Sequence, residues 1–150
     1  MPLKFYEEPA TFKLFTLDVG LMGAMTNTPA EAIIIGDNIF HEYKGAFTEL
    51  FVYTQLVTLN IPVYYHSSND SRVEIDFLVQ NGTQIIPIEV KAEENVKAKS
   101  LRTYIEKHPE LKGMRLSMKS HADQGWMTNI PLYAVNVCLK KTNPSTPASL

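Results

Sequence analysis

The sequence predicts an α/β domain, and three observations carry that prediction. From Gly45 onward the chain has a helical stretch, three strand-like runs, a second helical stretch and two more strand-like runs. The second and third strand-like runs flank Asn81-Gly82, a dipeptide typical of a tight β-hairpin turn. The length of 150 residues suits one domain that can bury a hydrophobic core.

The elements before residue 60 are predicted from periodicity and capping signals. Alternating apolar residues indicate a short strand over 12–16, and a short helix is expected over 19–25. Thr28-Pro29-Ala30-Glu31 combines a capping threonine, a proline at the first helical position and a glutamate, so a helix should cover 30–35. The clearest helix covers 46–59, where apolar residues form a single stripe.

The later elements follow the same rules of period and turn chemistry. Period-two alternation and β-branched residues mark strands, and a Pro109 stop marks the end of a helix. The expected elements are a strand over 61–65, two hairpin strands starting near 73 and 85, a helix over 97–107, strands over 114–118 and 132–137, and a disordered tail over 141–150.

Composition limits the classes of function. A net charge of −2 and a pI near 6.1 give no overall attraction to nucleic acid, so any phosphate-binding patch must be local. Cys138 is the single cysteine, which excludes an intramolecular disulfide and a cysteine-based zinc site and fits a reducing cytoplasm. The chain contains no apolar run long enough to span a membrane, so a cytoplasmic protein is expected.

The hairpin carries the strongest functional signal. Residues two apart share a strand face, so Asp76 projects with Glu74, and Glu89 projects with Lys91. A two-residue loop of Asn81 and Gly82 would place Glu74 opposite Glu89, whereas a four-residue loop would place Asp76 there. In both registers Asp76, Glu89 and Lys91 converge on one face of the sheet.

Such a face has two interpretations. Carboxylates opposite each other repel, and a hard cation such as Mg²⁺ or Mn²⁺ relieves that repulsion. A neighbouring lysine can then stabilise a phosphate or orient an attacking water. The other interpretation is a solvated polar face, and the pair Glu89 and Lys91 alone would favour it. Asp76 together with an acidic residue on the helix over 46–59 favours a metal site.

This order of elements, with Glu49 in the helix, Asp76 in the second strand and Glu89-x-Lys91 in the third, resembles the PD-(D/E)XK nuclease-like superfamily. A narrower likeness covers roughly residues 12–138. It resembles the largely uncharacterised C-terminal domain of a family of prokaryotic AAA+-type ATPases. The segments that carry it are 13–21, 45–49, 73–77, 86–91 and 126–133.

The resemblance implies a restriction-endonuclease-like three-layer domain, with a mixed central sheet and an αβββαβ core. It also implies that Asp76, Glu89 and Glu49 hold Mg²⁺ or Mn²⁺ and act with Lys91 in catalysis on DNA or RNA. Two departures are visible. Ile75 replaces the proline that precedes the aspartate, and Ser100 stands where related nucleases have a glutamine four residues before the tyrosine.

The resemblance also frames the domain organisation. The expected division is an N-terminal extension over 1–40, a nuclease-like domain over 41–140 and a tail over 141–150. No Gly-x-x-x-x-Gly-Lys-Ser/Thr motif occurs, so this chain has no P-loop ATP site, and the ATPase domain of a parent protein is an expected partner. The function expected is metal-dependent phosphodiester hydrolysis. The alternative is a catalytically silent module for binding or regulation within an ATPase.

Three further groups are weaker candidates. His66 could contact a metal or phosphate, although a lone histidine is more often structural. The tyrosines at 64, 65 and 104 could stack on bases but suit packing against the sheet. The basic run of Lys91, Lys97, Lys99 and Arg102 could hold phosphates or form the solvated face of a helix.

Overall fold

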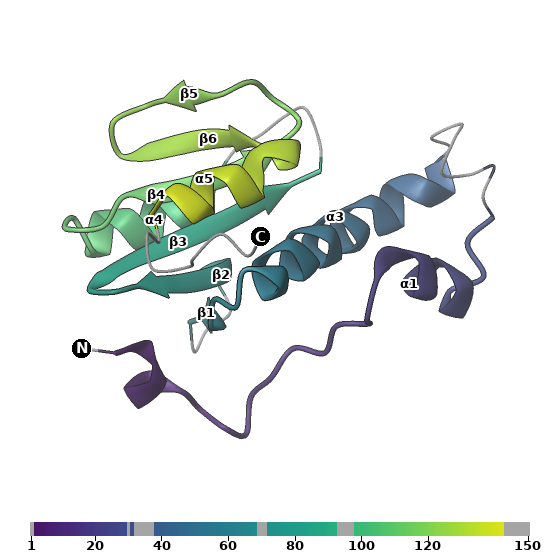
Figure 1. The fold of residues 1–150 in the computed structure, drawn as a ribbon, viewed down its shortest axis with the longest axis horizontal. Helices are drawn as coiled ribbons and strands as arrows, with labels where there is room; N and C mark the ends of the chain where they lie inside the picture. Colours follow the sequence, from purple (N-terminus) through teal and green to yellow (C-terminus); the bar gives the residue numbers. More distant parts are fainter. Residues whose placement is uncertain (1, 30, 32–37, 69–71, 93–97, 143–150) are drawn as a thin grey trace, which may run out of the picture.

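The structure, a computed structural model, describes residues 2–29, 31, 38–68, 72–92 and 98–142. These residues form an open mixed sheet of six strands with four α-helices (Figure 1). The helices are α1 (Val19–Met25), α3 (Asn38–Thr58), α4 (Lys99–Lys107) and α5 (Val135–Thr142), with short 3-10 helices η1 (Leu3–Tyr6) and η2 (Leu132–Ala134). The strands are β1 (Val63–Ser67), β2 (Glu74–Asn81), β3 (Gln84–Lys91), β4 (Gly113–Ser117), β5 (Ala122–Asp123) and β6 (Met127–Pro131).

The sheet combines two kinds of pairing. Its strand order is β1-β2-β3-β4-β6-β5. The strands β1, β2 and β3 form an antiparallel meander, whereas β3, β4 and β6 are parallel and β5 is antiparallel to β6. The element order from α3 to β4 is therefore the αβββαβ order that the sequence predicts.

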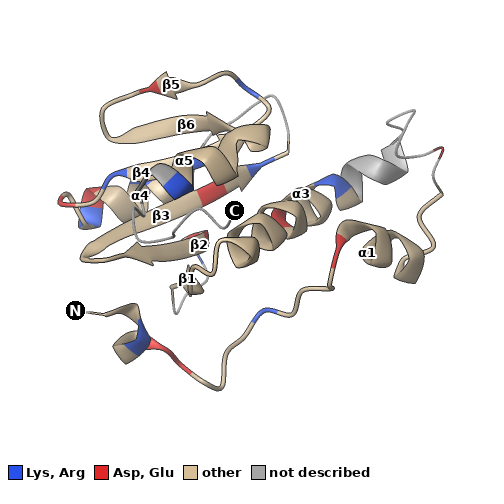
Figure 2. Ribbon diagram, viewed as in Figure 1, with Lys and Arg blue, Asp and Glu red and all other residues tan. Residues whose placement is uncertain are grey.

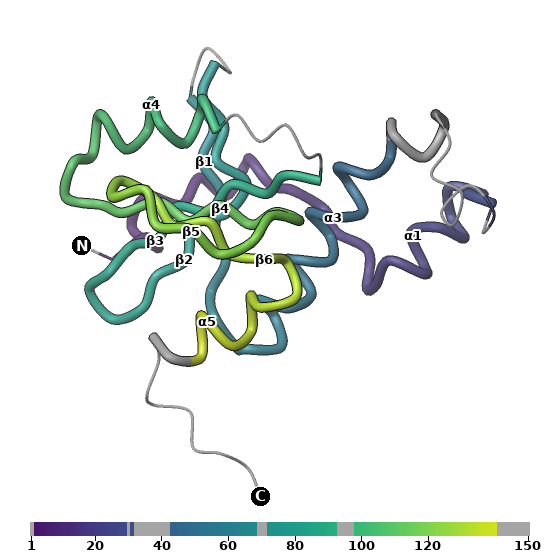
Figure 3. Tube along the Cα trace, turned by 90° about the horizontal axis from the view of Figure 1, so that it is seen from above, coloured from purple at the N-terminus to yellow at the C-terminus, as the bar shows by residue number. Residues whose placement is uncertain are grey.

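Helices cover both faces of the sheet, which gives three layers (Figure 3). On one face, Val52 and Leu56 of α3 and Leu139 of α5 pack against the apolar residues of β2, β3 and β4. On the other face, Leu101 and Ile105 of α4 pack in a second, smaller cluster. Burial on both sides explains why the central strands contain long apolar runs.

The hairpin between β2 and β3 adopts one of the two registers considered for it. Gly82 and Thr83 form the turn, with Gly82 at a φ of +60°, and Asn81 pairs with Gln84. Glycine accepts this left-handed conformation without a steric penalty. The ladder ends at Phe77 with Ile88 and has the register of the four-residue-loop alternative, and Asp76 and Glu89 lie one position beyond its end.

Two strand predictions are wrong. Residues 12–16 keep an alternation in which 12 and 14 are exposed while 13 and 15 are partly buried, but they belong to no strand of the described sheet. The β-branched residues over 132–137 suggested a strand, yet η2 and α5 occupy this range and β6 ends before it. In α5 the spacing of Val135 and Leu139 places both in the core, and tertiary packing overrides local preference.

The remaining boundaries shift by a few residues. The helix α1 matches its prediction, with the Asp18 carboxylate accepting the Leu21 N–H at 2.8 Å. The helix α3 begins at Asn38, well before the predicted residue 46. Residues 143–150 of the predicted tail, and all of the predicted helix 30–35 except residue 31, lie outside the described residues. Of the described helices, none has the length and apolar character needed to cross a membrane.

Candidate functional site

The strands β2 and β3 separate at the end that lies away from their turn. Their ladder stops at Phe77 and Ile88, although both strands continue for three more residues. Beyond that point Glu74 pairs with β1, while Glu89 pairs with Arg115 of β4. The result is a fork in the sheet, and the predicted residues Asp76, Glu89 and Lys91 lie at it.

Asp76 occupies the base of the fork. Its Oδ2 accepts the Val90 N–H at 2.6 Å, so its side chain supplies the acceptor to a backbone group beyond the end of the β2–β3 ladder. Burial raises the pKa of Asp76 from 3.8 to about 6, partly offset by that hydrogen bond and by Lys91, while the charges of Glu89 and Glu49 raise it further. A cation that approaches this buried carboxyl would stabilise its charged form.

Glu89 is buried on β3 with one oxygen paired and the other unpaired. Its side chain is 5% exposed, and its Oε1 lies 2.5 Å from the Lys91 ammonium. Among the described residues, no group donates a hydrogen bond to its buried Oε2. Figure 2 shows an acidic position on β3 followed by a basic position at the end of that strand. A buried carboxylate oxygen without a donor is unfavourable unless a further group satisfies it.

Glu49 is the fourth predicted residue, and it lies on α3 with a partner of its own. The Lys13 ammonium lies 3.1 Å from Glu49 Oε1 and 2.8 Å from Glu74 Oε1, and it therefore bridges α3 and β2. Burial would lower the pKa of Lys13, but the hydrogen bond to Glu74 and the charge of Glu49 raise it. Glu49 is close enough to influence Asp76, yet its carboxylate is engaged by this lysine.

A buried polar network next to the fork was missed by the sequence analysis. Asn129 of β6 accepts hydrogen bonds from Arg115 Nε at 2.8 Å and Ser117 Oγ at 2.7 Å. Its amide nitrogen donates to the backbone carbonyls of Lys119 and Ser120. The register aligns Glu89, Arg115 and Asn129 side by side across β3, β4 and β6. Nothing local marks this row, because neighbours in a parallel sheet come from distant segments.

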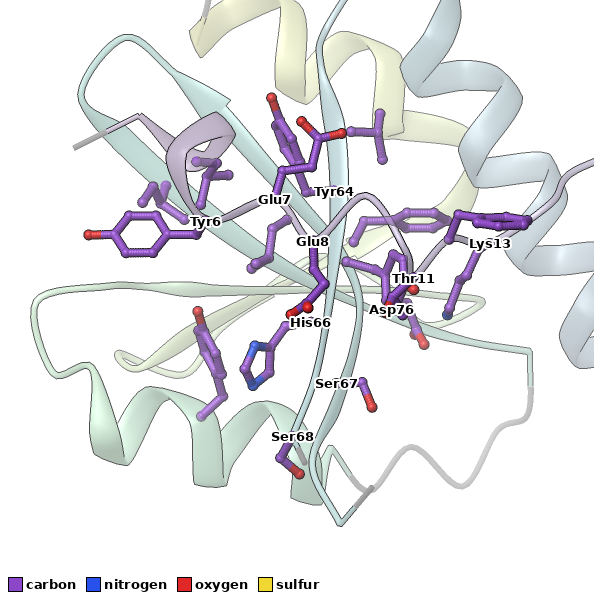
Figure 4. Close-up of a pocket in the computed structure, with 18 of the residues that line it drawn as sticks. Tyr6, Glu7, Glu8, Thr11, Lys13, Tyr64, His66, Ser67, Ser68 and Asp76 are labelled. Carbon is purple, nitrogen blue, oxygen red and sulfur yellow. The ribbon is translucent and has the colours of Figure 1, made fainter. Parts of the chain in front are cut away.

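A groove of about 890 Å³ runs along the edge of the sheet and reaches Asp76, whereas Glu89 and Lys91 are not among its lining residues. The N-terminal segment, β1, β2 and residues at the end of α4 line it. In Figure 4, Thr11, Lys13 and Asp76 lie together at one end, and Tyr6 and Glu7 lie toward the other. Asp76 is therefore accessible from a space large enough for a small ligand or part of a polymer.

The weaker candidates have mostly structural contacts. The rings of His66 and Tyr104 stand 5.0 Å apart, and burial lowers the pKa of His66, with the charges of His108 and Lys107 acting in the same direction. Tyr104 is buried in the cluster under α4. Arg102 pairs with Glu106 on the solvent side of α4, and Lys97 lies outside the described residues.

The structure thus brings Asp76, Glu89 and Lys91 together and places Glu49 nearby. Among the described residues, no group of three or more histidine, cysteine, aspartate or glutamate side chains is arranged to hold a metal ion. The fork offers two carboxylates, and Mg²⁺ sites in proteins commonly use one or two together with water and substrate phosphate. Its donors are oxygens only, which excludes the sulfur-rich sites preferred by softer metals.

Comparison with known families identifies the chain. Its residues 44–135 match the model of the family described as Domain of unknown function (DUF4143), and the chain belongs to that family. The match begins inside α3, contains every strand of the described sheet and includes all four predicted site residues, but it excludes Lys13. No curated protein and no solved structure gives a significant match to the chain.

Proposed function

We propose that this chain is a nuclease-like domain whose fork binds a divalent metal ion, Mg²⁺ or Mn²⁺, and supports phosphodiester hydrolysis on DNA or RNA. The observation that carries the proposal is the pair of carboxylates at the fork. Asp76 has a raised pKa, and Glu89 has a buried oxygen to which no residue in the described part of the chain donates. One cation between the two strands would relieve both conditions.

The donor set fits a hard divalent cation. Asp76 and Glu89 would hold it, with Glu49 completing the site directly or through water. When bound, the ion would supply Lewis-acid chemistry, by polarising a phosphoryl oxygen and lowering the pKa of a water molecule. The raised pKa of Asp76 means that metal binding and protonation compete for the same carboxylate.

The lysine of the fork has a role that follows from its position. Lys91 is about one-third exposed and projects from the same face as Glu89. An ammonium there can hold a phosphate oxygen or orient a water molecule for attack. In the structure Lys91 pairs with Glu89, so substrate would have to share or replace that contact.

The wider assignment to a restriction-endonuclease-like fold and to an ATPase partner is part of the proposal. It is supported by the αβββαβ order, the helices on both faces and the acidic fork between the second and third strands. The expected cytoplasmic location comes from the cysteine content and hydropathy of the sequence, and the expected action within a longer ATPase comes from the sequence resemblance. A fold by itself does not define activity, so the fork has to carry the functional argument.

A second candidate function is a catalytically silent module that binds or regulates within an ATPase. The specific observation in its favour is that lysines already engage two of the predicted carboxylates: Lys91 pairs with Glu89, and Lys13 pairs with Glu49. In this alternative the ion pairs would be permanent and structural.

The test is Mn²⁺-dependent cleavage of a panel of single- and double-stranded DNA and RNA by the purified chain. The matched variant is Asp76→Asn, which keeps the shape of the side chain and an acceptor for the Val90 N–H. We expect cleavage that requires Mn²⁺ and is abolished in the folded variant. Cleavage retained by the variant would contradict the assignment of Asp76, and activity independent of Mn²⁺ would contradict the metal site.

A further inference from the structure

Lys13 is a cation inserted among the acidic residues from outside the matched family region. Its ammonium contacts Glu49 of α3 and Glu74 of β2, and it stands 5.2 Å from the centre of the Tyr65 ring. Only 24% of its side chain is exposed. A lysine shared by two carboxylates and an aromatic face is held more firmly than a single surface ion pair.

The segment that carries Lys13 is attached to the domain by side chains. Phe15 stacks on Tyr53 of α3 with ring centroids 4.1 Å apart and an interplanar angle of 14°. Phe12 and Leu14, on the alternate positions, are exposed. Residues 12–16 add no strand to the described sheet, so side chains attach this stretch to the domain, among them the Phe15 ring and the Lys13 ammonium. Such a segment can shift without breaking a β-ladder.

The position of Lys13 couples this segment to the fork. Lys13 and Asp76 line the same groove and lie at the same end of it (Figure 4). The charge of Glu49, which Lys13 partly neutralises, also acts on Asp76. A second cation that enters the fork would therefore meet the repulsion of the Lys13 ammonium and compete with it for Glu49.

We propose that Lys13 is a built-in competitor of the divalent cation, so that the N-terminal segment sets the metal affinity of the fork. This inference rests on the proposed metal site. Lys13 lowers the affinity while it holds Glu49, and metal binding weakens the hold of Lys13 by the same factor, because coupling between two binding events is reciprocal. A metal-loaded fork is then linked to a loosened N-terminal segment and a wider groove.

The direct test is a Mn²⁺ titration of the whole chain, followed by the EPR signal of free Mn²⁺. Lys13→Met removes the charge and keeps most of the apolar stem, and we expect it to tighten Mn²⁺ binding about tenfold, within the usual range of coupling between two sites. In a Glu49→Gln background, Lys13→Met should tighten Mn²⁺ binding by much less than tenfold. Lys13→Arg should bind as the unchanged protein does.

Lys112→Met is the matched control, because Lys112 pairs with Asp123 on an exposed surface at the opposite edge of the sheet. It should leave Mn²⁺ affinity unchanged. Equal or weaker binding by Lys13→Met, with Asp76→Asn still abolishing binding, would overturn the competition and leave the metal site intact. An absence of Mn²⁺ binding in both the unchanged protein and Lys13→Met would overturn the competition and the metal site together.

A second measurement uses the unchanged protein and does not depend on the folding of a Lys13 variant. Saturating Mn²⁺ should accelerate tryptic cleavage after Lys13, because the metal loosens the contacts of that side chain, and Asp76→Asn should suppress that acceleration. Cleavage after Lys13 that is unaltered by Mn²⁺ in a protein that binds Mn²⁺ would show that the segment and the fork are independent. That result would overturn the inference even if Lys13→Met fails to fold.

Discussion

Two neighbouring parts of the sheet bury polar side chains, and they do so in different ways. Around Asn129, the arginine and serine that approach its oxygen and the carbonyls that approach its nitrogen are all hydrogen-bonded. At the fork, Asp76 has a raised pKa and Glu89 keeps an oxygen that receives no hydrogen bond from the residues that the structure describes. A satisfied buried network stabilises a fold, whereas the proposed function assigns the carboxylates of the fork to a metal ion.

The largest expected effect on stability comes from removing Asn129, the centre of the hydrogen-bonded network. Asn129→Ala should lower the free energy of unfolding by about 3–4 kcal/mol, because it leaves the buried Arg115 and Ser117 without their shared acceptor. Urea denaturation measures the change. Thr128→Ala, one residue earlier on the same strand, should cost less than about 1 kcal/mol. If the two variants lose a similar amount of unfolding free energy, the network around Asn129 is not a special source of stability.

At the fork, removing the charge of Asp76 should raise the free energy of unfolding at neutral pH. The difference between a pKa of 3.8 and one of about 6 corresponds to about 3 kcal/mol at neutral pH, so Asp76→Asn should gain up to about that much stability at pH 7. The folded state binds the proton more tightly than the unfolded state. The contribution of Asp76 is therefore most favourable below pH 4 and is lost as the pH rises from about 4 to 6.

The measurement is urea denaturation of both proteins at pH 4 and pH 7. The stability advantage of Asp76→Asn should be large at pH 7 and close to zero at pH 4. An advantage that does not depend on pH would mean that the raised pKa of Asp76 is not its source. A destabilised variant at pH 7 would mean that the folded protein stabilises the charged carboxylate of Asp76. The fork would then resemble the hydrogen-bonded network around Asn129.

The smallest effect concerns the ion pair of the fork itself, between Glu89 and Lys91. Lys91→Met should cost about 1–2 kcal/mol, less than a fully buried pair because the lysine is about one-third exposed. In a Glu89→Gln background the same change should cost much less, since the double-mutant cycle removes the shared interaction. Lys112→Met should leave the denaturation midpoint unchanged. An equal cost of Lys91→Met in both backgrounds would argue against a Glu89–Lys91 pair in solution.

Local sequence patterns predicted much of the fork. Alternation around Asn81-Gly82 predicted the hairpin and the shared face of Asp76, Glu89 and Lys91, because strand periodicity is a local property. The choice between the two registers was not available from the pattern. It depends on which residues form the turn, and Gly82 and Thr83 form it instead of Asn81 and Gly82.

The missed residues depend on contacts between distant segments. Lys13 meets Glu49 and Glu74, which lie 36 and 61 residues further along the chain, and only the packing of the N-terminal segment brings them together. Arg115 and Asn129 stand among apolar residues in short strands, and their pairing follows from the parallel register of β4 and β6. The period-two pattern around Lys13 was a usable signal, but it predicted a strand where the structure has a side-chain anchor.

The most direct test of the account is calorimetric titration of Mn²⁺ into the purified chain and into Asp76→Asn. We predict saturable binding to one site in the unchanged protein and none in the variant, with the variant folded and at least as stable at pH 7. Such a result would identify the unsatisfied carboxylates as a metal site. No binding at millimolar Mn²⁺, or equal binding by both proteins, would contradict it and favour the silent module.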